Sequence, residues 1–499
     1  MSSSGRTIAK NASVLMASQL LSWVMALLVT IILPRELGPV AVGQWFLAGT
    51  IWSFLTVFIT FGTDTLLTKE IARTPEKSGG LFLTSVIVRL VLFAAAAGFL
   101  IVFLRVVSYP AATAYLILLL GISQCVWTIS GVAQATLEGL ERMEYIALAN
   151  IVGKLVSTLA TILVIYLGYG VMALAVVSIL PPLVILAIQF KGLKRYAKFV
   201  RTVDFRQVFS MLKGGVPYFA STIILVVYTQ VDVLLLSILT NEETLGWYFA
   251  AENLVGALMF IPAVIMQAMF PVLARMHASS SDAAPGMVSR GFNLLILCAV
   301  PVGLGVFIIA NPLVRLLYGA SFVNSGPILA ITGIALIFMY QNVLLGRYLV
   351  AVDRQNTWTV VMTVATFLSV PLSWGLVTWC ATTFGNGGIG GALTFVLTES
   401  GMFMTGLVLM PRGMLSRADF FLNLRVLASG VAMIAATWFL RDLFIAIPIA
   451  VGALTYGALI LILRAVPKEN VTLIREFSRS VLRRFQNRIA PAPGFRGRS

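Results

Sequence analysis

The stretch Val86–Phe103 reads VIVRLVLFAAAAGFLIVF and holds a single charged residue, Arg89. Apolar runs of about twenty residues recur along the chain, and a helix of about twenty residues crosses the ~30 Å of hydrocarbon in a bilayer. Backbone polar groups find no water in lipid, so a spanning segment is either a helix or a strand of a closed barrel. Barrel strands alternate in polarity over about ten residues. These runs do not alternate, so the sequence predicts an all-α, polytopic membrane protein.

The composition agrees with this fold class. Of 499 residues, 59% are hydrophobic and only 11% are charged, whereas soluble domains carry about a quarter charged residues. The three cysteines are scattered through apolar runs, which favours neither a disulfide framework nor a metal site. No nucleophile elbow, Gly-rich phosphate loop or metal-ligand pair is present. We therefore expect no cofactor, no metal and no enzymatic activity.

About fourteen transmembrane helices are predicted, with the last two separated only by Arg441 and Asp442. The predicted spans are 12–33, 43–63, 81–104, 112–134, 147–166, 171–190, 215–239, 246–270, 291–311, 327–349, 357–382, 389–410, 424–440 and 443–463.

The net charge of +16 is distributed as a membrane topology predicts, and does not indicate nucleic-acid binding. If the N-terminus is cytoplasmic, the inner segments hold 30 of the 35 Lys and Arg residues. Positive charge concentrates in cytoplasmic loops, so we expect a multi-pass protein of the inner or plasma membrane with both termini in the cytoplasm. The predicted domains are a six-helix bundle at 1–190, a basic cytoplasmic linker at 191–213, a second six-helix bundle at 214–411, two further helices at 412–466, and a basic cytoplasmic tail at 467–499.

The tail carries apolar residues at helical spacing, from Ile474 to Ile489, with arginines between them. A basic amphipathic helix binds anionic lipid of the inner leaflet. A solvated basic tail is the alternative interpretation, and the pattern leaves both open.

Three pairs of similar segments indicate an internal repeat. Gly43–Ala48 (GQWFLA) resembles Gly246–Ala251 (GWYFAA), 203 residues later. Leu137–Arg142 resembles Leu349–Arg354, and Gly170–Leu174 resembles the segment starting at Gly388. Because six is an even number, two six-helix halves share one orientation and are related by a pseudo-twofold axis along the membrane normal. Two such bundles around one cavity are typical of alternating-access transporters. A channel would show a filter or pore loop, which is not found.

Several motifs, in order, resemble those of the polysaccharide transporter, or oligosaccharide flippase, family of the multidrug/oligosaccharidyl-lipid/polysaccharide exporter superfamily. They cover roughly residues 8 to 410. One departure is Val233, where family sequences often carry Arg. The motifs are Leu33–Pro39 (LPRELGP), Gly43–Trp45 (GQW), Phe61–Arg73 (FGTDTLLTKEIAR), Glu138–Arg142 (EGLER), Gln230–Leu236 (QVDVLLL), Gly246–Ala251 (GWYFAA), Gln267–Pro271 (QAMFP) and Leu316–Phe322 (LLYGASF).

The resemblance implies a flippase that moves a lipid-linked oligosaccharide from the inner to the outer leaflet for surface polysaccharide synthesis. It also implies polysaccharide polymerases and glycosyltransferases as partners. Three alternatives stay open: a multidrug or cation antiporter of the same superfamily, a lipid-linked peptidoglycan-precursor flippase, and a membrane-embedded sugar polymerase or ligase. The short outer linkers disfavour the last.

Ionisable residues inside a span are costly and usually face protein or a wet cavity. Arg89 is a candidate ligand for the substrate phosphate, because guanidinium binds phosphate with a planar fork. Asp232, Glu252 and Glu399 are candidates for a coupling Na⁺ or H⁺. The alternative for all four is structural pairing of Arg89 with one of the three acids. Asp64 is placed near an inner end, where its side chain can reach the interface.

Overall fold

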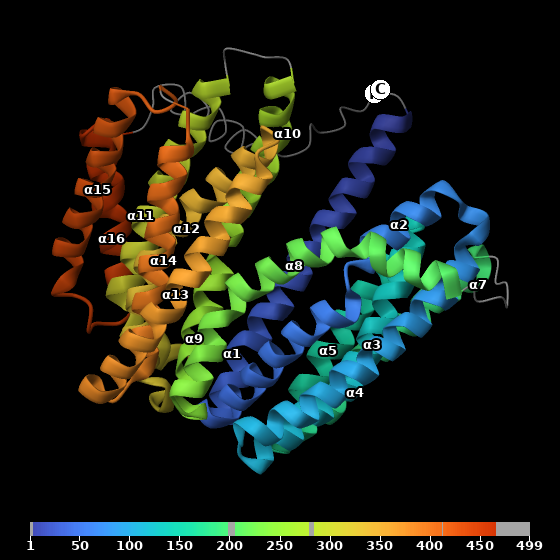
Figure 1. The fold of residues 1–499 in the computed structure, drawn as a ribbon. Helices are drawn as coiled ribbons and strands as arrows, with labels where there is room; N and C mark the ends of the chain where they lie inside the picture. The colour runs from blue at the N-terminus through green and yellow to red at the C-terminus, as the bar shows by residue number, and fades with distance from the viewer. Residues whose placement is uncertain (1–2, 198–204, 279–283, 412, 466–499) are drawn as a thin grey trace, which may run out of the picture.

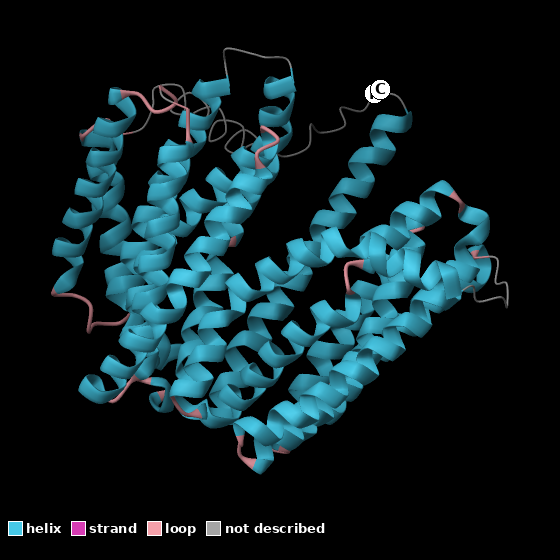
Figure 2. Ribbon diagram, viewed as in Figure 1, coloured by secondary structure: helices cyan, strands magenta, loops and turns pink. Residues whose placement is uncertain are grey.

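The structure is a computed structural model that describes residues 3–197, 205–278, 284–411 and 413–465. Every regular element in these ranges is a helix (Figure 2). The all-α prediction is therefore confirmed. The predicted tail at 467–499 and the middle of the predicted linker lie outside the described residues.

The helices form two bundles and a C-terminal hairpin (Figure 1). The first bundle, blue to teal, contains α1 (Ser3–Thr60), α2 (Thr63–Arg73), the short 3₁₀ helix η1 (Pro75–Lys77), α3 (Ser78–Val107), α4 (Ala111–Gly139), α5 (Met143–Tyr166), α6 (Gly170–Val177) and α7 (Leu180–Tyr196). The second bundle, green to orange, contains α8 (Phe205–Leu239), α9 (Glu242–Leu258), α10 (Phe260–Ala278), α11 (Ala284–Tyr318), the 3₁₀ helix η2 (Ala320–Phe322), α12 (Ser325–Ala351), α13 (Gln355–Phe384) and α14 (Gly387–Leu409). The hairpin of α15 (Arg417–Trp438) and α16 (Ala446–Ile462) packs on α11.

Twelve stretches of the described chain are long and apolar enough to cross a membrane. One of them, Leu28–Arg73, includes a break in α1 at Gly38, whose backbone is at φ 77° and ψ 168°. Glycine adopts positive φ readily, and Pro39 directly after it cannot donate a helical hydrogen bond. Counting the two sides of this break separately, and adding the 17-residue apolar α16, gives the fourteen predicted spans.

Two predicted spans are interrupted by short turns. The span at 171–190 consists of α6 and α7, which separate just before Pro181, and the span at 246–270 consists of α9 and α10, which separate just before Pro262. Proline lacks an N–H and restricts the residue before it, so a helix breaks there readily. The ends of the predicted linker are also helical, because α7 runs to Tyr196 and α8 starts at Phe205.

The structure contains one helix that hydropathy does not predict. Helix α2 is short and amphipathic, and its Leu67 and Ile71 are fully buried. A methyl group at Gly139 of α4 would overlap the Ile71 side chain, so the two helices are in close contact. Packing of one apolar face stabilises this helix, although its composition resembles that of a cytoplasmic loop.

The first pair of similar segments, at Gly43 and Gly246, meets at the pseudo-twofold axis. A methyl group at Gly43 would overlap the Glu242 carbonyl, and one at Gly246 would overlap the Pro39 carbonyl. Pro39 precedes Gly43 by four residues, as Glu242 precedes Gly246. The rings of Phe46 and Phe249, three residues after each glycine, lie 4.1 Å apart. Equivalent residues of the two halves therefore contact each other reciprocally.

The second pair, Leu137–Arg142 and Leu349–Arg354, forms the same turn in each half. The Arg142 N–H donates to the Leu137 carbonyl at 2.9 Å, and the Arg354 N–H donates to the Leu349 carbonyl at 2.7 Å. Between them Glu141 has φ 57° and Asp353 has φ 58°, a left-handed conformation that is uncommon outside glycine. Helices α5 and α13 then begin directly after these turns. The predicted pseudo-twofold repeat is confirmed by this geometry.

The bundles meet at the end that contains the start of α9. Glu242 accepts hydrogen bonds from Gln44 of α1, at 2.8 Å, and from Thr113 of α4. The Tyr109 and Ser237 hydroxyls lie 3.2 Å apart in the same region. We call the contacts of Gln44, Thr113, Tyr109 and Ser237 around Glu242 the Glu242 seam. Toward the opposite end, which contains the end of α10 and the start of α11, the ribbons of α10–α14 diverge from the first bundle, and α8 crosses to pack on α2 and α3 (Figure 1).

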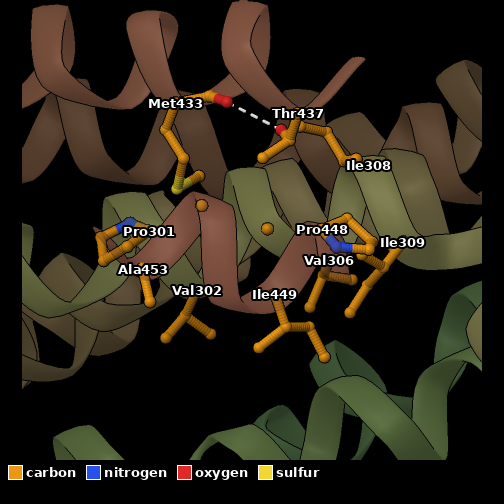
Figure 3. Close-up of a pocket in the computed structure, with 12 residues that line it drawn as sticks. Pro301, Val302, Val306, Ile308, Ile309, Met433, Thr437, Pro448, Ile449 and Ala453 are labelled. Carbon is orange, nitrogen blue, oxygen red and sulfur yellow. Dashed lines mark hydrogen bonds between the residues drawn. The ribbon is translucent and has the colours of Figure 1, made fainter. Parts of the chain in front are cut away.

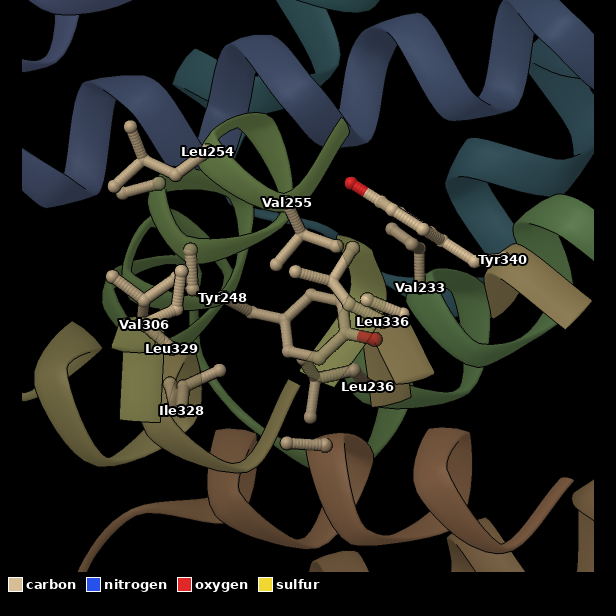
Figure 4. Packing of buried hydrophobic residues seen from close by; sticks show 14 of the residues in the cluster. Val233, Leu236, Tyr248, Leu254, Val255, Val306, Ile328, Leu329, Leu336 and Tyr340 are labelled. Atoms are coloured by element: carbon tan, nitrogen blue, oxygen red, sulfur yellow. The ribbon is translucent and has the colours of Figure 1, made fainter. Parts of the chain in front are cut away.

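The interior of the second bundle is well packed. Tyr248 of α9 lies among aliphatic side chains from α8, α11 and α12 (Figure 4). Its neighbour Tyr340 is fully buried and donates its hydroxyl proton to the Leu258 carbonyl at 2.7 Å. Large apolar side chains elsewhere point outward, for example Phe367, which is 75% exposed. A surface of this kind is stable when lipid surrounds it.

Candidate functional site

The three acids singled out from the sequence gather in the second bundle. Glu399 of α14 is only 3% exposed. Its carboxylate accepts hydrogen bonds from the Tyr228 hydroxyl of α8 and from the Asn342 amide of α12, the latter at 2.7 Å. Helices that are far apart in sequence therefore hold this carboxylate from two sides.

Asp232 of α8 is the member of this group that is near both other acids. Its carboxylate accepts a hydrogen bond from the Ser373 hydroxyl of α13 at 3.2 Å. It is close enough to interact electrostatically with both Glu252 and Glu399. Glu252 of α9 has one buried carboxylate oxygen, Oε2, without a hydrogen-bond partner. Asp232, Glu252 and Glu399 are referred to below as the acidic cluster.

The acidic cluster has no basic partner among the described residues. Ion pairs between described residues occur outside the cluster and join Arg73 to Glu70, Arg89 to Asp64 and Arg441 to Asp442. No group of three or more His, Cys, Asp or Glu residues in the described chain is arranged to hold a metal ion. A buried carboxylate is costly unless it is paired or protonated. Uptake of protons or a small cation would therefore stabilise the acidic cluster.

Arg89 lies in the first bundle, apart from the acidic cluster. Its guanidinium forms a salt bridge with Asp64 of α2 and donates to the Thr128 carbonyl of α4 at 3.1 Å. It also donates to the Thr63 hydroxyl at 3.4 Å. The partner is thus a residue that sequence analysis placed at the membrane interface, and none of the three acids expected for structural pairing.

The two partners differ in exposure. The Arg89 side chain is 1% exposed, whereas that of Asp64 is 42% exposed. The Nε atom of Arg89 is buried and has no hydrogen-bond partner. The guanidinium is thus largely satisfied within the protein, and the carboxylate that pairs with it reaches solvent.

A cavity of about 300 Å³ lies inside the first bundle. Its walls come from α1, α4, α5, α6 and α7, and they carry two tryptophans together with hydroxyl and amide side chains. The charges within the spans do not indicate these residues, because the lining is neutral. The available signal was the row of polar residues Gln124, Ser157 and Thr161 within apolar spans.

A second cavity, of about 310 Å³, lies between α11 and the α15–α16 hairpin (Figure 3). Its lining is apolar apart from Thr437, whose hydroxyl donates to the Met433 carbonyl of its own helix at 2.7 Å. This cavity presents no free polar group from its lining side chains.

Solved transporter structures share this fold. The lipid II flippase MurJ in an inward closed conformation matches with a TM-score of 0.70 and 15% identity, over 90% of this chain and 98% of that chain. An inward-facing multidrug resistance MATE family transporter of the MOP superfamily matches with a TM-score of 0.60 and 16% identity, over 77% of this chain and 94% of that chain. The eukaryotic MATE transporter AtDTX14 matches with a TM-score of 0.53 and 15% identity, over 79% of this chain and 92% of that chain.

At the level of sequence, no curated protein matches the chain. A family model described as polysaccharide biosynthesis protein matches residues 8–277. The matched region is more than half of the chain and extends from α1 into α10. It also covers the first seven motifs of the sequence resemblance completely. The chain belongs to the polysaccharide biosynthesis protein family.

Proposed function

We propose that the protein is a flippase that moves a lipid-linked oligosaccharide from the inner to the outer leaflet for surface polysaccharide synthesis. Family membership supports a role in polysaccharide biosynthesis, and the fold is that of membrane transporters and flippases. The observation that carries the proposal is the difference between the two ends of the bundles. The start of α9 is bonded to α1 and α4 at the Glu242 seam, whereas α10–α14 diverge from the first bundle at the other end, where α8 crosses to α2 and α3 (Figure 1).

Alternating access needs contacts that close one side while the other is open. The Glu242 seam lies in the linker Asn241–Glu243, which the charge distribution assigns to the outer side. The diverging ends of the bundles then face the cytoplasm (Figure 1). The conformation is thus suited to receive a substrate from the inner leaflet, and opening the seam would release it outward.

The acidic cluster supplies the coupling step in this proposal. Three carboxylates without a basic partner favour uptake of H⁺ or Na⁺, and ionisable groups within spans commonly mark ion pathways. Asp232 lies on α8, a helix that contacts both bundles. Binding of a cation there can therefore bias the position of α8. Asp232→Asn is expected to abolish the response of transport to the coupling gradient, while Glu76→Gln, an exposed acid of η1, leaves it unchanged.

Arg89 is proposed to bind the substrate phosphate by exchange with Asp64. The half-exposed Asp64 carboxylate and the unpartnered Arg89 Nε support such an exchange. Arg89→Lys keeps the charge and loses the bidentate fork, so transport is expected to fall at normal protein abundance. Full transport by a stable Arg89→Ala protein would eliminate this role.

The proposed location is the inner or plasma membrane, with both termini in the cytoplasm. There the flippase would receive its cargo from glycosyltransferases and deliver it to a polysaccharide polymerase. The basic tail would hold anionic lipid of the inner leaflet. A peptidoglycan-precursor flippase would differ only in cargo.

One observation favours a second candidate, a multidrug or cation antiporter. The acidic cluster resembles a site for an organic cation, since buried carboxylates and nearby tyrosines attract such ligands. An antiporter would confer drug resistance on cells without altering their surface polymer.

A clean deletion tests the main proposal. We expect lipid-linked oligosaccharide to accumulate in the inner leaflet and one surface polysaccharide to disappear, while assembly of the repeat unit continues. The measurement is leaflet-specific labelling of the sugar together with analysis of surface polymer, and a wild-type copy serves as the control. Normal surface polymer in a deletion strain that has no paralogue would contradict the proposal.

A further inference from the structure

The cavity of the first bundle combines two aromatic walls with polar groups. Trp45 of α1 and Trp127 of α4 line it, and Gln124, Ser157 and Thr161 contribute an amide and two hydroxyls. Trp127 is 50% exposed, so the cavity has an opening beside this ring. Small-molecule sites in proteins are typically apolar and aromatic concave surfaces with a few placed polar groups.

Three polar side chains of this lining are available for a ligand, whereas the hydroxyls of Ser123 and Ser178 donate to backbone carbonyls. In the described part of the chain, the side chains of Gln124, Ser157 and Thr161 form no hydrogen bond to protein. By contrast, hydroxyls such as those of Thr332 and Thr394 in the second bundle donate to the carbonyl one helical turn earlier in the same helix. Free donors and acceptors beside aromatic rings indicate a partner that carries hydroxyl groups.

The internal repeat relates this cavity to the acidic cluster. Residues of α1 correspond to those of α8 and α9 at an offset of 203, from Gly43 and Gly246. Residues of α5 correspond to those of α13 at an offset of 212, from the starts of these helices at Met143 and Gln355. The corresponding pairs are Val29 with Asp232, Trp45 with Tyr248, Ser157 with Ser369 and Thr161 with Ser373. The two sites therefore occupy equivalent places in the two bundles.

The two equivalent sites differ in charge. In the second bundle Asp232 bonds to Ser373 and lies near Glu252. In the first bundle the positions of these two acids hold Val29 and Gly49. A methyl group added at Gly49 would meet nothing within 4 Å. The first bundle thus keeps the hydroxyls and the aromatic wall of the site and lacks both carboxylates.

We infer that the cavity lined by Trp45, Trp127, Gln124, Ser157 and Thr161 binds a neutral sugar ring of the lipid-linked substrate. The inference rests on the proposed function and assigns the sugar to the first bundle. The apolar face of a sugar ring packs on an aromatic face, and its hydroxyls bond to the amide and hydroxyl side chains. The lining of the cavity contains no charged side chain, which suits a neutral ring.

Binding to purified full-length protein tests the inference. Two kinds of probe are compared: a short-chain isoprenoid diphosphate without sugar, and the same diphosphate carrying one hexose, which is glucose, galactose or N-acetylglucosamine. We expect at least one hexose probe to bind more tightly than the bare diphosphate. Trp127→Ala and Gln124→Leu should each weaken binding of that probe about three- to tenfold and leave the bare diphosphate unaffected.

Trp374→Ala is the matched control, because Trp374 is 57% exposed on α13 and does not line the cavity. It should bind both kinds of probe like the wild type. Unchanged preference for the sugar in a folded Trp127→Ala or Gln124→Leu protein overturns the inference. Equal wild-type affinity for all probes overturns it too and leaves the proposed function standing. A wild-type protein that binds no probe contradicts the proposed function itself.

Discussion

Arg89 and Asp64 form an ion pair with one buried and one half-exposed partner. Removing one partner of a buried pair leaves an uncompensated charge, which costs about 3–5 kcal/mol. Asp64→Asn leaves the charge on a guanidinium that is 1% exposed, whereas Arg89→Met leaves it on a carboxylate that reaches water. We expect the free energy of unfolding to fall more in Asp64→Asn than in Arg89→Met. Thermal unfolding in detergent measures both.

The double variant Asp64→Asn/Arg89→Met is the control for this prediction. It removes both charges and should be more stable than Asp64→Asn alone. Equal losses in the two single variants would mean that burial does not distinguish the partners.

Sequence alone identified the costly residues and missed their neighbours. A charge in an apolar run is visible in the sequence, so Arg89 and the three members of the acidic cluster were found. Which residues meet depends on how spans pack across the bundle, and hydropathy contains no such information. Hydropathy does not indicate Asp64 as a partner, because this residue lies on α2, a short helix without a long apolar run.

At the scale of helices, Gly43 sets how closely α1 approaches α9. A side chain there would overlap the Glu242 carbonyl. Gly43→Ala is expected to separate the helices, weaken the Glu242 seam and lower the thermal unfolding temperature. Gly49→Ala is the matched control on the same helix, since a methyl group at Gly49 meets nothing within 4 Å. If the unfolding temperatures of the two variants decrease equally, the close approach of α1 to α9 at Gly43 is refuted.

The helices themselves were largely predictable, because each span has to bury its own backbone hydrogen bonds in lipid. Their interruptions were less so. A window of about twenty residues averages over the turns before Pro181 and Pro262, and it merges α6 with α7 and α9 with α10.

At the scale of the whole molecule, the charge asymmetry predicts which end of the bundles faces the cytoplasm. Reporter fusions near 168, 242 and 386 should lie outside, and fusions near 200, 282 and the C-terminus should lie inside. The structure places the Glu242 seam at the end assigned to the outside. A periplasmic signal from position 200 would reverse the assignment and turn the proposed inward-facing conformation into an outward-facing one.

The reciprocal contact of Gly43 and Gly246 also has a meaning for ancestry. Both halves use the same surface to contact each other, as the two subunits of a symmetric dimer do at an isologous interface. A six-helix unit that paired with its own copy would already possess this interface. Because such a unit begins and ends on the same side of the membrane, a gene duplication needs only a short connecting segment to join two copies. The later history of the chain would then be one of divergence, in which one copy acquired carboxylates where the other kept valine and glycine.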